Sequence, residues 1–138
     1  MTRFRAVLAT TAAAFLVWGA AGAATAASAD DVLLPHPGPD GLVWVEEHWG
    51  DGGVASGGAW EGLPTVLTVA CEGGGTVTVT MESQQDQVAA FTADCPAGEP
   101  GRGSVTMPAG VVRSGSFTIG VDASSDSVRW ALTVTQPE

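Results

Sequence analysis

The sequence predicts an all-β protein, a single antiparallel β-sandwich of about seven to eight strands with an immunoglobulin-like or jelly-roll-like topology. Short segments alternate apolar and polar residues, for example 67–71, 77–81 and 128–134, which is the period of a strand with one buried face. Turn-forming residues separate these segments at short intervals. No window has the spacing of an amphipathic helix.

Residues 64–81, PTVLTVACEGGGTVTVTM, predict two strands joined by a glycine-rich turn. Glycine supplies the positive φ that a tight hairpin needs, so we expect these two strands to pair with each other. The alternation places one set of side chains on a single face that must meet a second apolar layer: Leu67, Val69, Cys71, Val77, Val79 and Met81.

The other expected strands are 42–49, 88–95, 104–107, 116–121 and 127–135, with 111–113 as a short addition. Both faces of 42–49 mix apolar and polar residues, which predicts an edge strand or a bulged one. Residues 50–58, GDGGVASGG, and 96–103, PAGEPGRG, are expected to be loops. We expect Trp130, Phe117, Phe91, Val69 and Val79 to form the layer that the two sheets share.

The N-terminal residues resemble an export signal. Arg3 and Arg5 precede an apolar run, and residues 27–29 are the small residues that a signal peptidase recognises. We therefore expect a signal peptide at 1–29, an extended N-terminal segment at 30–41 and the β-sandwich domain at 42–138. The alternative is a membrane anchor. It is less favoured because a spanning helix needs about 20 apolar residues and this run is shorter. The expected product is secreted, has no membrane span and is a monomer.

The expected secreted chain is strongly acidic. Removal of residues 1–29 leaves three arginines, no lysine, all 15 Asp and Glu residues and a formal charge of −12. Such a chain repels nucleic acids and anionic membranes, which argues against both as partners. We expect Arg113 and Arg129 to form surface ion pairs worth less than about 1 kcal/mol each.

Two cysteines in an exported chain predict a disulfide between Cys71 and Cys95. Closing a loop of this length would stabilise the fold by about 3 kcal/mol. The alternative, a free nucleophilic thiol, is less favoured because no histidine lies near either cysteine in the sequence.

Aromatic and acidic residues are concentrated between positions 44 and 61. An exposed indole can stack on a sugar ring while carboxylates accept hydrogen bonds from its hydroxyls. The candidate ligand-binding residues, expected at one end of the sandwich, are Trp44, Glu47, Trp49, Asp51 and Trp60. Trp44 and Trp49 have opposite strand parity and share a face only if the strand is bulged. The alternative is that these indoles cover the core, the commoner fate of tryptophan.

No catalytic set is evident in the sequence. The histidines are His36 and His48, and no Gly-x-Ser-x-Gly motif accompanies them. The histidines and bridged cysteines do not form a zinc ligand set, and Asp122 and Asp126 do not have the spacing of a calcium loop. We therefore expect no enzymatic activity, no metal and no cofactor.

The segments CEGGGTVTVT, ADCPAGEPG and SGSFTIGVDA…VRWALTVTQPE, with the leader and the single cysteine pair, resemble small secreted all-β proteins of actinomycetes of unassigned function. The resemblance covers most of residues 63–138 and implies a fold but no activity. The chain is also similar in size, export and charge to the small acidic sandwich proteins that carry enediyne chromophores. Those proteins typically have two disulfides, and this chain can form one.

The leading hypothesis for function is a non-enzymatic binding module at or outside the cell envelope, with an extracellular glycan as the candidate ligand. The alternative is a secreted inhibitor or partner-binding protein that presents the loop 96–103 to a hydrolase. A small-ligand carrier and a weak hydrolase are the third possibilities.

Overall fold

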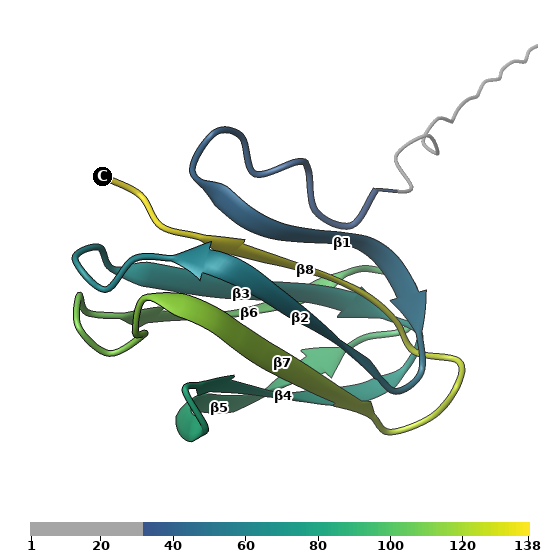
Figure 1. Ribbon diagram of the computed structural model, residues 1–138. Coiled ribbons are helices and arrows are strands. Elements are labelled where there is room, and N and C mark those ends of the chain that lie inside the picture. The colour runs from purple at the N-terminus through teal and green to yellow at the C-terminus, as the bar shows by residue number, and fades with distance from the viewer. Residues whose placement is uncertain (1–31) are drawn as a thin grey trace, which may run out of the picture. The chain divides into compact units, whose positions relative to one another are not determined.

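The computed structural model describes residues 32–138, which form eight β-strands and no helix (Figure 1). The expected signal peptide and cleavage site lie outside the described residues. The strands are β1 (Gly41–Trp49), β2 (Gly52–Ala59), β3 (Thr65–Glu72), β4 (Gly75–Ser83), β5 (Asp86–Cys95), β6 (Gly101–Met107), β7 (Gly115–Ala123) and β8 (Arg129–Thr135). Within residues 32–138, no helix has the length and apolar character to cross a membrane.

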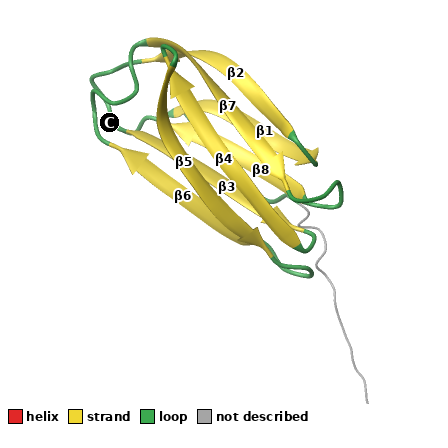
Figure 2. Ribbon diagram, turned by 90° about the horizontal axis from the view of Figure 1, so that it is seen from below, coloured by secondary structure: helices red, strands yellow, loops and turns green. Residues whose placement is uncertain are grey.

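The strands form two four-stranded antiparallel sheets that face each other as layers (Figure 2). The first sheet has the order β1-β8-β3-β6 and the second has the order β2-β7-β4-β5. The predicted all-β sandwich is thus confirmed. The core between the layers includes Trp130, Phe117, Val69 and Val79, with Phe91 packed against it, as the alternation predicted.

The expected hairpin at residues 64–81 is wrong, because β3 lies in the first sheet and β4 in the second. The connection crosses from one layer to the other. The N–H groups of Gly73 and Gly74 donate to the carbonyl oxygens of Pro96 and Cys95, at 3.1 and 2.7 Å, and so bind the end of β5 and the residue after it. The six side chains assigned inward are all fully buried, but they face each other across the core instead of sharing one face.

Residues 50–58 were expected to be a loop, and most of them instead form β2, which pairs with β7. Glycine is unfavourable in strands, but at Gly53 a side chain would not fit, since a Cβ there would lie 2.6 Å from the carbonyl oxygen of Ile119. The close approach of the β2 and β7 backbones therefore explains why a glycine is present at position 53 within a strand.

Two shorter expectations are also corrected. Residues 101–103 belong to β6, so the loop expected at 96–103 is confined to 96–100. Residues 111–113 form a turn and not a strand: Val111 N–H donates to the Pro108 carbonyl at 3.2 Å, and Arg113 N–H donates to the Ser83 hydroxyl at 2.8 Å.

The predicted disulfide is present and joins Cys71 of β3 to Cys95 of β5, so it links the two sheets covalently. Both cysteines lie in the core. Trp130 of β8 pairs with Cys71 of β3, and its buried indole donates from Nε1 to the carbonyl oxygen of Gly50, at 2.7 Å. That bond ties the β1–β2 turn to the centre of the first sheet.

Candidate functional site

Two indoles of the described chain are exposed to solvent, Trp49 by 56% and Trp60 by 57%. Trp49 ends β1 immediately before β2, and Trp60 follows the end of β2. The two side chains are therefore separated by the length of β2, about 26 Å at roughly 3.3 Å per residue. The expectation that all five candidate residues lie at one end of the sandwich is wrong for Trp60.

A bulge in β1 changes the relation between Trp44 and Trp49. The register shifts between Val45 and His48, as expected for a bulged edge strand. Trp44 then pairs with Thr133 and Trp49 with Arg129, two positions of β8 that have the same parity. Because paired residues point to the same side of a sheet, both indoles lie on the outer face of the first sheet.

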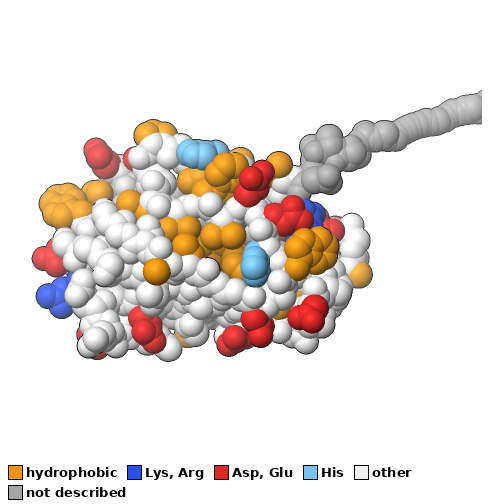
Figure 3. Space-filling model, turned by 45° about the vertical axis from the view of Figure 1, so that its right-hand side comes forward, with side chains coloured by type: hydrophobic (Ala, Val, Ile, Leu, Met, Phe, Trp, Pro, Cys, Tyr) orange, Lys and Arg blue, Asp and Glu red, His pale blue; other side chains and the backbone are white. Residues whose placement is uncertain are grey.

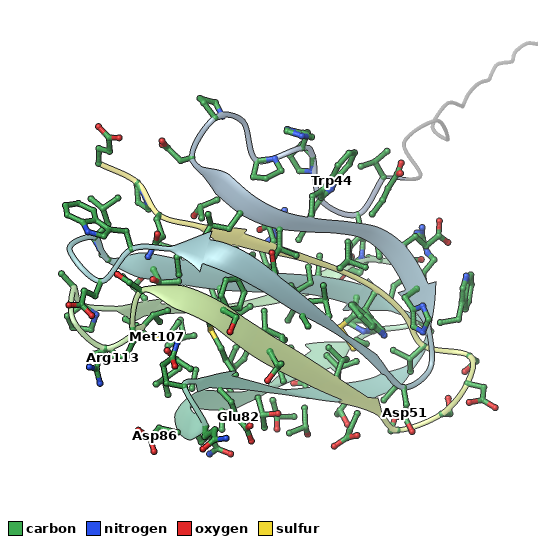
Figure 4. The ribbon with its side chains drawn as sticks, viewed as in Figure 1. Trp44, Asp51, Glu82, Asp86, Met107 and Arg113 are labelled. Atoms are coloured by element: carbon green, nitrogen blue, oxygen red, sulfur yellow. A yellow bond between two sulfur atoms is a disulfide. The ribbon has the colours of Figure 1, made fainter. Side chains whose placement is uncertain are left out.

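Trp44 is nevertheless partly covered. Its Nε1 donates to the carbonyl oxygen of Leu34 at 3.1 Å, and the ring of His36 packs edge-on against it with centroids 4.9 Å apart. Figure 4 shows Trp44 pointing from β1 toward the segment that precedes this strand. Trp44 thus supports the N-terminal segment and is not an open platform.

The exposed indole of Trp49 lies next to a charge network centred on Arg129. The guanidinium contacts Glu72 Oε1 at 2.7 Å and Glu47 Oε2 at 3.5 Å. The side chain of Arg129 is only 14% exposed, so the expectation that it forms a weak surface ion pair is wrong. Burial alone would lower the pKa of Arg129, but the hydrogen bonds and charges of Glu72 and Glu47 outweigh it and raise this pKa above its ordinary value.

Asp51 lies at the same end, but its carboxylate has a structural role. One oxygen accepts a hydrogen bond from the backbone N–H of Ala123, at 2.8 Å, and so joins the β1–β2 turn to the end of β7. His48 contacts the carbonyl oxygen of Asp51 at 3.0 Å, and its ring packs beside Trp130. Glu47 remains the exposed candidate carboxylate at this end, on the rim of the Arg129 network.

Trp60 is held from several sides. The buried amide of Gln136 accepts from Trp60 N–H at 2.9 Å and donates to its carbonyl oxygen at 3.0 Å. A Cβ at Gly62 would lie 2.6 Å from the indole, so that ring rests directly on a glycine. The backbone of Trp60 is therefore fixed, and its exposed ring contacts Gly62.

The loop that carries Trp60 is also bound to the loop before β7. Gly110 N–H donates to the Glu61 carbonyl oxygen at 2.7 Å, and Ser114 accepts from Glu61 N–H at 3.0 Å. Arg113 and Glu61 form an exposed ion pair at 3.4 Å, as expected for Arg113. Figure 4 places Arg113 and Asp51 at opposite ends of the sandwich, which separates the two indole sites.

Sequence reasoning missed two residues next to the exposed indoles: Arg129, which pairs with Trp49 across β1 and β8, and Gln136, which binds the backbone of Trp60. Arg129 was treated as an ordinary surface charge because its pairing with β1 and β3 depends on the order of the strands. Gln136 follows the last strand and has no motif around it. Neither residue has a local signal that could have identified it.

Both histidines make hydrogen bonds to backbone atoms, His36 with Gly38 N–H and His48 with the Asp51 carbonyl. Residues 32–138 contain no group of three or more His, Cys, Asp or Glu side chains that could hold a metal ion. On the face shown in Figure 3, Asp and Glu side chains are dispersed, while hydrophobic side chains gather along the middle. The exposed indoles are therefore the most distinctive surface features of the described chain.

Comparison with family models, with curated proteins and with solved structures finds no match to this chain.

Proposed function

We propose that this protein is a secreted, non-enzymatic module that binds glycans at or outside the cell envelope through Trp49 and Trp60. The observation that carries the proposal is that both indoles are more than half exposed although tryptophan is usually buried. A large exposed aromatic surface costs solvation free energy in the free protein, and a ligand that covers it recovers this energy.

The ordered backbone around the two indoles supports stacking on a sugar ring. Trp60 rests on Gly62 and its backbone is held by Gln136, so the backbone that carries the indole is already ordered before a ligand binds. Trp49 lies at the end of a paired strand, opposite Arg129. Carboxylates near both rings, Glu47 and Glu61, can accept hydrogen bonds from hydroxyl groups.

The separation of the indoles favours a polymeric ligand. Each ring can stack on a single sugar unit, and one indole provides only a weak site. Two sites on opposite ends of one rigid sandwich can bind two chains or two stretches of a polymer, and the combined affinity then exceeds that of either site. The proposal thus favours a cell-wall or extracellular polysaccharide over a free monosaccharide.

The experiment is a co-sedimentation assay of the chain that begins at Asp30 with insoluble polysaccharides and with peptidoglycan. Trp49→Ala and Trp60→Ala should each weaken retention by about tenfold, and the double variant should abolish it. Val111→Ala, a change at a separate exposed apolar residue, serves as the control. Equal retention of the wild type and the double variant, or no retention on any material, would contradict the proposal.

A protein partner is the second candidate, and the Trp60 end favours it. Val111 is 36% exposed on the loop whose Gly110 is bonded to Glu61, beside the Arg113–Glu61 pair. An exposed Trp with an apolar neighbour and an arginine is typical of a protein-binding hot spot. The test is co-purification with a secreted hydrolase. This candidate is favoured if Trp60→Ala and Val111→Ala abolish the co-purification and Trp49→Ala leaves it intact.

A further inference from the structure

The segment 32–40 lies over the outer face of the first sheet and forms a second, smaller apolar cluster there. Leu33 and Leu34 are buried against Ala70 of β3 and Ala131 of β8. The Leu34 carbonyl oxygen accepts the indole hydrogen bond of Trp44. The segment is thus attached at its beginning by two leucines and farther along by the contact of His36 with Trp44.

A pocket of about 340 Å³ lies between this segment and the sheet. Leu34, Pro35 and Pro37 line it from the segment, and Thr68 and Arg102 line it from β3 and β6. Its volume is within the range of small-molecule sites, which begins at about 300 Å³. The pocket therefore combines apolar groups with a cationic one, away from both exposed indoles.

Arg102 is distinguished by its lack of an ionic partner. Arg113 pairs with Glu61, and Arg129 pairs with Glu47 and Glu72. In residues 32–138, no carboxylate oxygen lies within 4.0 Å of Arg102, although the chain contains 15 Asp and Glu residues. A guanidinium that has several free donors at the edge of a pocket is suited to a carboxylate.

His36 lines the pocket from the N-terminal segment and supplies a second donor. Its Nδ1 accepts a hydrogen bond from Gly38 N–H at 3.0 Å, so the neutral ring carries its proton on Nε2. That N–H is free to donate to a ligand. Thr68, between the two, already shares a hydrogen bond with Ser104 at 3.1 Å, so its hydroxyl is held in place.

We propose that this pocket binds a small organic carboxylate. The carboxylate group lies at the Arg102 guanidinium with His36 Nε2–H as a second donor, and the apolar body of the ligand packs on Pro35 and Pro37. This site is independent of the glycan proposal, because it uses neither exposed indole.

The test uses a variant in which Trp49 and Trp60 are replaced by Phe, which leaves Trp44, in contact with His36, and the buried Trp130 as the indoles of residues 32–138. Hexanoate is the probe, with 1-hexanol, hexylamine and inorganic phosphate as comparisons. Saturation-transfer NMR measures binding of the organic probes, and phosphate competes against hexanoate. A change in indole emission that Trp44→Phe removes locates the binding at this pocket. We expect saturable binding of hexanoate, no saturable binding of the alcohol or amine, and little competition by phosphate.

Arg102→Gln should weaken hexanoate binding at least tenfold, and His36→Phe, which keeps a ring against Trp44, should weaken it several-fold. Arg113→Gln removes the same charge at the other end of the sandwich and should leave it unchanged. The proposal is overturned if hexanoate does not bind, if Arg102→Gln binds it as the parent does, or if phosphate or the alcohol binds as tightly.

Discussion

The side-chain amide of Gln136 forms two hydrogen bonds with the backbone of Trp60, at 2.9 and 3.0 Å, across 76 positions of sequence. A third bond joins the same amide to the hydroxyl of Thr65, at 2.9 Å. Gln136 is 5% exposed, so its polar atoms are satisfied inside the protein. The C-terminal residues thereby set the position of the exposed indole at the end of β2.

Gln136→Ala should lower the free energy of unfolding by about 2–3 kcal/mol, because it leaves buried polar groups of Trp60 and Thr65 without partners. Denaturant titration followed by circular dichroism measures the change. Gln87→Ala, at an exposed glutamine of β5, is the matched control and should stay within about 0.5 kcal/mol of the wild type. Equal stabilities of the two variants would show that the Gln136 bonds contribute little.

Replacing Cys71 and Cys95 together by Ala should reduce the free energy of unfolding by about 3 kcal/mol. The bridge closes a loop of sequence separation 24 and joins the two sheets, so its loss increases the entropy of the unfolded chain. The measurement is thermal and denaturant unfolding of the double variant beside the oxidised wild type. An unchanged midpoint in both experiments would refute this expectation.

Glycine at position 53 is required by the approach of β2 to β7, whereas glycine at position 57 is not. A Cβ at Gly53 would lie 2.6 Å from the Ile119 carbonyl oxygen, and a Cβ at Gly57 would meet nothing within 4 Å. We expect Gly53→Ala to destabilise the protein by more than about 1 kcal/mol, because backbone must move to accept it. Gly57→Ala, in the same strand, should be neutral or slightly stabilising. Similar unfolding midpoints for both variants would contradict the close pairing of β2 and β7.

The side-chain alternation predicted which residues are buried, but it could not predict which strands pair. The side chains of Leu67 and Val79 would be buried if their strands formed a hairpin in one sheet. They are equally buried when the two strands lie in different sheets that face each other across the core. The choice between these arrangements is made by the backbone of Gly73 and Gly74, whose N–H groups bind the end of β5 and the residue after it. That partner is more than 20 residues away, and no local pattern points to it.

The candidate site was predicted in part for the same reason. The sequence indicated Trp49 and Trp60 as candidates together with Trp44, but it did not show which of the three are exposed. The mixed faces of residues 42–49 suggested the bulge in β1. The distance between the two indoles depends on β2, whose glycines predicted a loop. Arg129 and Gln136 make their contacts with residues far away in the sequence, so their places beside the indoles became evident only in the folded chain.

The attachment of the N-terminal segment depends on Leu34, which is 3% exposed and packs in the cluster with Ala70 and Ala131. Leu34→Ala should destabilise this contact and lower the barrier to detachment of residues 32–40, while the sandwich core stays intact. Hydrogen exchange should therefore increase in β1 at Trp44 and in β8 at Thr133. With Trp49 and Trp60 replaced by Phe, the indole emission should shift to longer wavelength. Val32→Ala, at a neighbouring side chain that is 52% exposed, should change neither signal. If the Leu34→Ala and Val32→Ala variants have the same hydrogen-exchange rates, burial of Leu34 does not attach the segment to the sheet. The pocket beneath the segment would then not depend on Leu34.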